Sequence, residues 1–255
     1  MVRASRTTLA FSTIGDDGNV LYEPYSLNSG ISLAANLREA FQTAPLLGQS
    51  YGTVLVMVDS PHMVVPVDLY REDQRETLFR HAFTEQEQQV VVSAVLPELH
   101  GVALFSVGRD FHTVTTDHWP QARFLPVCAP VWNHLHQRSY TGPRAKLYAY
   151  FHERQVEVFS FGQNRFKFCN SFAFSQADDV LYYLLSVWKQ LGMSADRDEL
   201  HLAGDYMAQA GGLQQLAEEF VRRVYVVNPV GEFNRAPVTQ IPGMPYDVML
   251  YYLKR

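Results

Sequence analysis

Alternating apolar and polar positions in the second part of the chain predict three strands that follow one another closely. In chain order these strands are Ala145–Phe151, Val156–Phe161 and Arg165–Phe174. Two short turns, His152–Gln155 and Gly162–Asn164, join them. The pattern therefore predicts a three-stranded antiparallel meander.

The apolar period then lengthens to that of a helix. Val180–Leu191 carries apolar residues at helical spacing, with Ser175 and Asp178 as a predicted capping box and Gly192 as the predicted end. A strand, a helix, a strand and a helix are predicted next, at 199–205, 212–223, 224–229 and 246–253. A meander followed by alternating helices and strands is the order of a ribonuclease-H-like α/β fold, in which the later strands join in parallel.

The first part begins in a similar way and is then interrupted. Strands are predicted at 7–14, 20–26 and 53–58, with a helix at 31–41. The interruption, at about 61–108, carries predicted strands at 63–70, 89–95 and 102–107 and a helix at 72–82. A helix near 111–117, a strand at 124–127 and a helix at 131–138 precede a linker at 139–144. We therefore predict two ribonuclease-H-like halves, 1–142 and 143–255, the first with a small inserted α+β subdomain.

Composition narrows the class of protein. Hydrophobic residues make up 47% of the 255 residues, which is enough for a sizeable core. The net charge is −5, with 18% charged residues, so no electrostatic feature indicates nucleic acid or an acidic membrane as a partner. Cys128 and Cys169 form no CxxC pattern, which is typical of reduced thiols. With no apolar run of membrane-spanning length, we expect a soluble, cytoplasmic protein.

Four segments carry a resemblance to a known family. They are "VLVMVDSPHMVVPVDLY", "FGQNRFKFCNSFAF", "VLYYLLSVWKQLG" and "LHLAGD". They resemble a family of uncharacterised Bacteroidetes proteins, domain of unknown function 3822, to which an actin-like ATPase fold is assigned. The resemblance spans nearly the whole chain. It implies a fold shared with actin, heat-shock-70 chaperones and hexokinases, and a bacterial source, but it does not imply an activity.

In that superfamily ATP and magnesium lie between the halves, and each half contributes a hairpin with aspartate and glycine. The first hairpin here offers Gly15, Asp16, Asp17 and Gly18, which also form a common plain-turn sequence. In the second hairpin Tyr150 or His152 stands where the acid is expected, and its turn contains no glycine.

The adenosine-side motif of the superfamily, a hydrophobic strand that ends in two glycines, is reduced here to Gly204 followed by Asp205. Three expected nucleotide contacts are thus altered together, in the two hairpins and at this strand end. The sequence favours a degenerate nucleotide site over a variant one.

The sequence gives little support for metal binding or for nucleophilic catalysis. His134 and His136 point apart at their spacing on a helix, and no metal-binding motif is present, so we expect no metal site. No motif of nucleophilic catalysis occurs, and we name no catalytic residue. The phenylalanines of the third strand are predicted to share one face and to lie in the core, at positions Phe166, Phe168, Phe172 and Phe174.

The prediction is an interaction scaffold or adaptor that lacks a cofactor and whose cleft or inserted subdomain meets a protein partner. The alternative is an ATP-binding switch, ATPase or phosphotransferase, with magnesium near Asp16 or Asp17 and adenosine beside Gly204. Whether the chain is an enzyme stays open at this point, with the balance against it. The long segment from Asn228 to Pro245 is either a binding loop or a plain connection.

Overall fold

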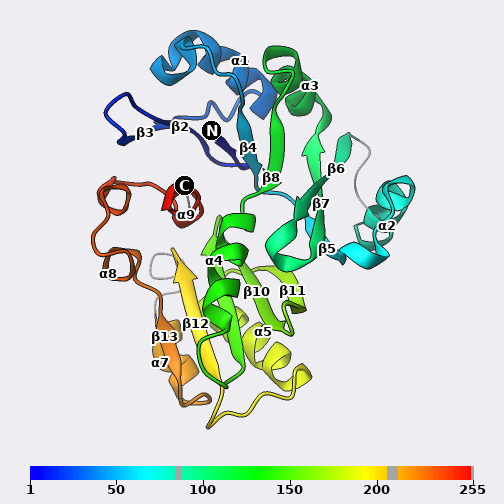
Figure 1. Cartoon of the computed structure of the whole chain (residues 1–255), viewed down its shortest axis with the longest axis vertical. Coiled ribbons are helices and arrows are strands. Elements are labelled where there is room, and N and C mark those ends of the chain that lie inside the picture. Colours follow the sequence, from blue (N-terminus) through cyan, green and yellow to red (C-terminus); the bar gives the residue numbers. More distant parts are fainter. Residues whose placement is uncertain (84–87, 206–211, 254–255) are drawn as a thin grey trace. The chain divides into compact units, whose positions relative to one another are not determined.

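The structure is a computed structural model that describes residues 1–83, 88–205 and 212–253 (Figure 1). The chain divides into two compact units. The first unit consists of Met1–Pro97, Gly101–Ala129 and Ile241–Met244. The second consists of Glu98–His100, Pro130–Gln240 and Pro245–Arg255. The predicted division into halves at residues 142 and 143 stays a prediction.

The first unit is built on a five-stranded sheet with the order β3-β2-β1-β4-β8. Its strands are β1 (Val2–Ala4), β2 (Leu9–Ile14), β3 (Val20–Tyr25), β4 (Leu55–Val58) and β8 (Arg123–Pro126). Strands β1, β2 and β3 form an antiparallel meander, and β4 and β8 extend the sheet in parallel from β1. The sequence patterns missed β1, which is the central strand, because three residues are too few to show a period.

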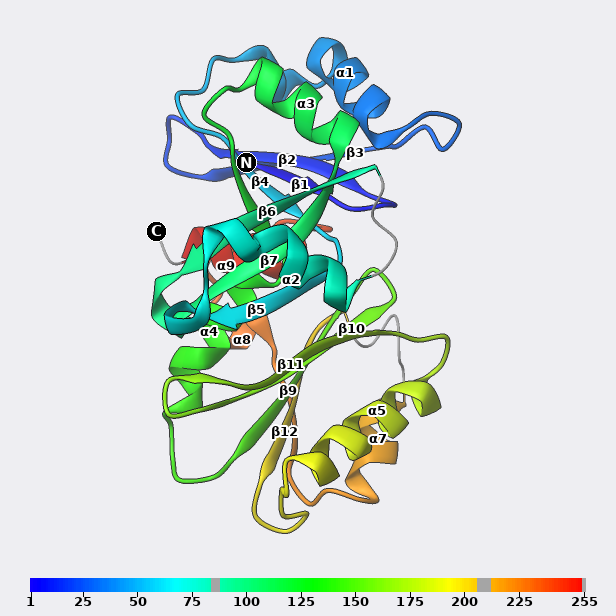
Figure 2. The same cartoon turned by 90° about the vertical axis from the view of Figure 1, so that its right-hand side faces the viewer.

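Two helices cover one face of this sheet (Figure 2). Helix α1 spans Leu33–Thr43 and begins at Ser32, whose hydroxyl accepts a hydrogen bond from the Ala35 N–H. Helix α3 spans Arg109–His118. Their ends meet where the ring of Phe41 stacks on His118, with centroids 3.8 Å apart. A short 3₁₀ helix, η1 (Pro45–Gly48), follows α1.

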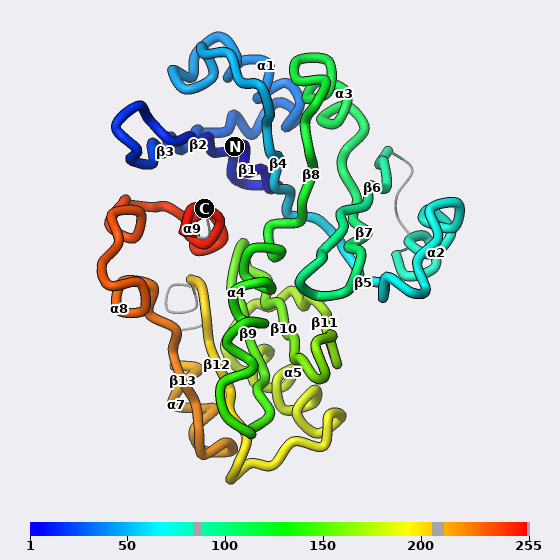
Figure 3. Tube along the Cα trace, viewed as in Figure 1, coloured from blue at the N-terminus to red at the C-terminus, as the bar shows by residue number. Residues whose placement is uncertain are grey.

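The predicted insertion is present between β4 and β8 as a three-stranded antiparallel sheet with the order β5-β7-β6 (Figure 3). Its elements are β5 (His62–Pro66), η2 (Val67–Leu69), η3 (Glu72–Gln74), α2 (Arg75–Ala82), β6 (Gln89–Leu96), η4 (Pro97–Leu99) and β7 (Gly101–Gly108). Its small core is Val65, Phe79, Val91, Val102 and Leu104. The strand predicted over 63–70 ends at Pro66, because proline has no N–H for the ladder, and a 3₁₀ turn follows.

The second unit repeats the strand order of the first, as β11-β10-β9-β12-β13. Its strands are β9 (Lys146–His152), β10 (Gln155–Gly162), β11 (Arg165–Ala173), β12 (Glu199–Gly204) and β13 (Val224–Val226). Strands β9, β10 and β11 form the predicted meander, and β12 and β13 join in parallel. Each unit therefore has the topology expected of a ribonuclease-H-like fold.

A bulge in β11 overturns the prediction that four phenylalanines share one face. Ser160 pairs with Phe168, but its neighbour Phe161 pairs with Phe166, so Lys167 is an extra residue on β11. The extra residue turns Phe166 to the opposite face, where it packs against Trp132. The remaining three phenylalanines contact the core under the helices, as predicted: Phe168, Phe172 and Phe174.

The helices of the second unit are α4 (Ala129–Ser139), α5 (Ala177–Gln190), α7 (Leu213–Glu218), α8 (Pro229–Glu232), η5 (Pro237–Gln240) and α9 (Tyr246–Leu253). Helices α5 and α7 cover one face of the sheet (Figure 2) and share its core with Leu147, Leu200 and Leu202. The predicted capping box is shifted by one residue, because the Asp179 carboxylate accepts the N–H groups of Ser175 and Gln176. Among the described residues, no helix has both the length and the hydropathy to cross a membrane.

Candidate functional site

The turn between β2 and β3 holds four of the predicted site residues, Gly15, Asp16, Asp17 and Gly18. Its backbone closes on itself, since the Gly15 N–H donates to the Asn19 carbonyl (2.8 Å) and the Gly18 N–H donates to the Gly15 carbonyl (3.0 Å). The Asp17 carboxylate accepts hydrogen bonds from the backbone N–H of Asn19 (3.0 Å) and from its side-chain amide (2.7 Å). The side-chain bond lowers the pKa of Asp17. Both oxygens of Asp17 thus serve the turn, and a nucleotide role for these residues stays a prediction.

The corresponding turn of the second unit joins β9 and β10 through two residues, Glu153 and Arg154. His152 pairs with Gln155 across it, so the loop is as short as a hairpin allows. Glu153 and Arg154 both have positive φ angles, +48° and +60°. This left-handed conformation favours glycine, and both residues carry long side chains there instead. Because this turn contains no glycine, two long side chains stand in a backbone conformation that favours glycine.

Tyr150 and His152, either of which is expected from the sequence at the place of the acid, both lie on β9. Both are buried, and their rings stack with centroids 4.9 Å apart. The Tyr150 hydroxyl donates a buried hydrogen bond of 2.9 Å to Oδ2 of Asp247 on α9. Tyr150 is thereby fixed at both its ring and its hydroxyl.

The remaining predicted site residues, Gly204 and Asp205, lie at the end of β12 beside Tyr150. Gly204 has a φ of +81°, and a Cβ atom there would lie 2.4 Å from the Phe151 carbonyl oxygen and 2.7 Å from Cε2 of Tyr150. The Asp205 N–H donates to the same carbonyl of Phe151 (3.1 Å). The Tyr150 ring therefore takes up the space that a side chain at residue 204 would need. The six predicted site residues fall into two sets, one in each unit.

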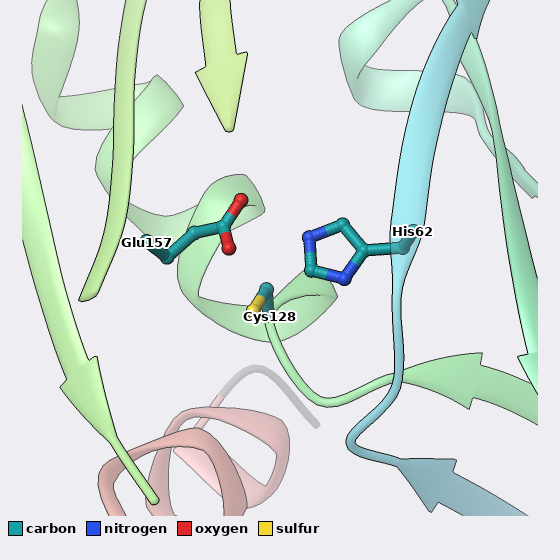
Figure 4. A group of neighbouring side chains, drawn as sticks. All are labelled: His62, Cys128 and Glu157. Atoms are coloured by element: carbon teal, nitrogen blue, oxygen red, sulfur yellow. The ribbon is translucent and has the colours of Figure 1, made fainter. Parts of the chain in front are cut away.

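A histidine and a cysteine that the sequence patterns did not pair lie close together in the first unit (Figure 4). A ring nitrogen of His62 and Sγ of Cys128 are within 4.8 Å of each other. His62 Nδ1 is 2.9 Å from the Ser60 carbonyl oxygen, and Cys128 is fully buried. Sixty-five residues separate the two in the chain, so no spacing signal could reveal them. Two ligands do not complete a tetrahedral zinc site, and the expected lack of a metal stays a prediction.

The third side chain labelled in Figure 4, Glu157, belongs to the second unit. It is fully buried on β10, where its Oε1 accepts a hydrogen bond of 3.3 Å from the Cys169 thiol. Burial and the neighbouring Glu157 carboxylate raise the pKa of Cys169 well above its usual range. A raised pKa is the opposite of the activation that a nucleophilic cysteine needs.

The first unit also contains a groove of about 720 Å³ between the inserted subdomain and the main sheet. Residues 90–95 of β6 form one wall, and residues 122–125 at β8 form another. The remaining lining residues are Leu55, Arg75 and His112. The ring of His112 stacks on Phe124 with centroids 4.9 Å apart, and burial lowers the pKa of His112. The volume of the groove is in the range of ligand-binding pockets. Strands of two sheets build the groove, so the linear pattern could not reveal it.

Comparison with known proteins gives one family and several structures. Residues 1–224 match the family described as "Protein of unknown function (DUF3822)". A Bacteroides thetaiotaomicron protein, described as having an actin-like ATPase fold and unknown function, is 29% identical, with a TM-score of 0.80 over 89% of this chain and 90% of its own. The PilM–PilN type IV pilus biogenesis complex aligns at 11% identity and a TM-score of 0.60 over 99% of this chain and 97% of its own. No curated protein matches the sequence.

Proposed function

Because the chain belongs to the family of proteins of unknown function DUF3822 and has an actin-like ATPase fold, we propose that it is a non-catalytic scaffold or adaptor with a degenerate nucleotide site. In this role the chain contacts a protein partner through the inserted subdomain of the first unit. The actin-like framework supplies rigid sheets that hold this surface in place, and no reaction is assigned to it.

One observation carries the proposal. Within the second unit, the Tyr150 ring covers Gly204, and the adjoining turn consists of Glu153 and Arg154. Backbone amides approach an anion closely where glycines leave room for it. The buried hydrogen bond from Tyr150 to Asp247 opposes any movement of the ring away from Gly204. A nucleotide would therefore have to displace a fixed core side chain.

Two further observations agree with an adaptor. In the first unit the Asp17 carboxylate is already used by its own turn, which leaves it poorly placed to hold magnesium. The fold also occurs in a structure described as the PilM–PilN complex, so it is compatible with protein assembly. That likeness is at the level of the fold alone.

A melting-temperature assay tests the proposal. A ligand at a hundred times its Kd stabilises a fold by roughly 2.7 kcal/mol, which for a chain of this size raises the melting temperature by about 5–10 °C. We expect about 5 mM Mg-ATP or Mg-ADP to change the melting temperature by less than about 1 °C. A rise of several degrees that is lost in Asp16→Asn/Asp17→Asn, but kept in the surface control Glu39→Gln on α1, would refute the proposal in favour of a nucleotide-dependent switch. Gly204 variants are unsuitable for this test, because an added Cβ would collide with backbone.

A further inference from the structure

The inserted subdomain has an outer strand, β6, whose free edge faces the groove of the first unit. Among the described strands of its sheet, β6 pairs with β7 alone. The Arg109 N–H donates to the Gln88 carbonyl just beyond this pair, and the Ser106 N–H donates to Pro61 on the other side of β7. In an antiparallel ladder, alternate residues direct their N–H and C=O groups to the partner strand. On β6, the N–H and C=O groups that point out of the sheet, away from β7, consequently belong to Val91, Ser93 and Val95.

The residues of this edge lack two of the features that usually protect an outer strand, a charged side chain and a proline. Protein edges are commonly blocked by charged side chains, proline or a covering segment. The stretch from Gln89 to Leu96 reads QVVVSAVL, with no charge and no proline, and Val95 is 65% exposed. In contrast, the nearby edge strand β8 ends at Pro126. The edge of β6 is therefore suited to accept another strand.

The groove beside this edge has a definite chemical character. Its apolar lining includes Val90, Val92 and Phe124, and the charged side chains among the described residues that line it are Arg75 and Arg123, with no acidic one among these described residues. Arg75 is paired with Glu72, whereas Arg123 is exposed at the start of β8. A cationic, partly apolar groove complements a segment that carries both apolar side chains and a carboxylate.

We propose that the groove binds an extended segment of a partner protein, which adds to β6 as a fourth strand and places an acidic side chain near Arg123. Main-chain hydrogen bonds to Val91, Ser93 and Val95 supply the affinity, and apolar side chains at alternate positions contact the groove. This inference rests on the proposed adaptor role, and it assigns the surface and the chemistry of the partner.

Selection from a random library of twelve-residue peptides displayed on phage, with the full chain as bait, tests the inference. We expect the enriched peptides to carry Asp or Glu together with apolar residues at alternate positions. Arg123→Glu should weaken an enriched peptide about fivefold, because an exposed ion pair is lost and repulsion takes its place. The matched control Arg38→Glu, an exposed arginine on α1, should leave binding unchanged. A lack of enrichment, or equal effects of the two variants, would overturn the inference.

Methylation of the peptide's own amides separates strand addition from other modes of binding. An added strand donates hydrogen bonds to β6 from every second amide of the peptide. N-methyl groups on that set of amides should weaken binding roughly tenfold or more, and N-methyl groups on the other set should change binding little. Equal losses from both sets would overturn the inference, as would concentration-dependent dimers of the free chain that Ser93→Pro abolishes. Failure here leaves the melting-temperature result intact, whereas stabilisation by Mg-ATP that Asp16→Asn/Asp17→Asn abolishes refutes the proposed function whether or not a peptide binds.

Discussion

The Tyr150 ring lies against Gly204 on the neighbouring strand, so close that a Cβ atom at residue 204 would be 2.7 Å from Cε2 of Tyr150. The contact joins β9 to β12 at the end of the sheet where open α/β folds place their ligands. In this protein the same place holds a buried ring and a buried hydrogen bond to Asp247. The contact leads to the first of three predictions.

Gly204→Ala should lower the free energy of unfolding by at least about 2 kcal/mol, because an alanine would have to adopt a positive φ and would also collide with the Phe151 carbonyl. Gly142→Ala is the matched control, since Gly142 has a φ of +79° and nothing within 4 Å of an added Cβ. Urea unfolding of both variants measures the difference. Equal losses of unfolding free energy in the two variants would mean that the positive φ angle alone causes the loss and that the Tyr150 ring moves aside at little cost.

The hairpin turn of β9 and β10 should become more stable when its residues suit their conformation. Asn and Gly tolerate the left-handed region far better than Glu153 and Arg154 do. Glu153→Asn/Arg154→Gly should therefore raise the unfolding free energy by roughly 1 kcal/mol. Glu153→Gln/Arg154→Gln removes the same two charges without relieving the backbone and should give no such gain. A similar gain from that control would indicate a charge effect.

His201 on β12 should make stability depend on pH. Burial lowers its pKa from the ordinary value of 6.5, although the hydrogen bond of 3.1 Å between Nε2 and the Glu199 carboxylate opposes this. The unfolded chain therefore binds a proton more readily than the folded one, and stability is lost as the pH falls from about 6.5 towards the lower folded value.

The test compares urea unfolding at pH about 7.5 and about 5.5 in the parent chain and in His201→Gln. The parent should lose more stability between the two conditions than the variant does. Parallel losses would show that this histidine contributes nothing to the pH dependence.

The sequence predicted helices and strands correctly where the pattern of apolar and polar residues extended over many positions. Helix α9 has the predicted bounds, Tyr246–Leu253, and the meander of the second unit lies within a residue or two of its prediction. The family resemblance, carried by the segments quoted above, is confirmed together with the actin-like fold. Failures came from short or irregular pieces. Val2–Ala4 has too few residues to show a period, and the extra residue Lys167 reverses the face of Phe166.

The candidate site was less accessible from sequence, because its features depend on neighbours that are distant in the chain. The sequence could show that glycine is missing from the turn at Glu153 and Arg154. It could not show that the Tyr150 ring fills the space above Gly204, nor that Asn19 engages both oxygens of Asp17. The groove depends on β6 and β8, which belong to different sheets. The nucleotide role of the six predicted residues stays a prediction.

The insertion between β4 and β8 has an evolutionary consequence. Residues 59–122, which carry the inserted subdomain and then α3, separate two strands that are neighbours in one ladder. The entropy of closing such a loop grows only with the logarithm of its length, by roughly 0.6 kcal/mol for each doubling. The parent sheet therefore tolerates lengthening, shortening or wholesale exchange of this module at little thermodynamic penalty. Natural variation can therefore change the length and content of the inserted subdomain while the five-stranded sheet of the first unit persists.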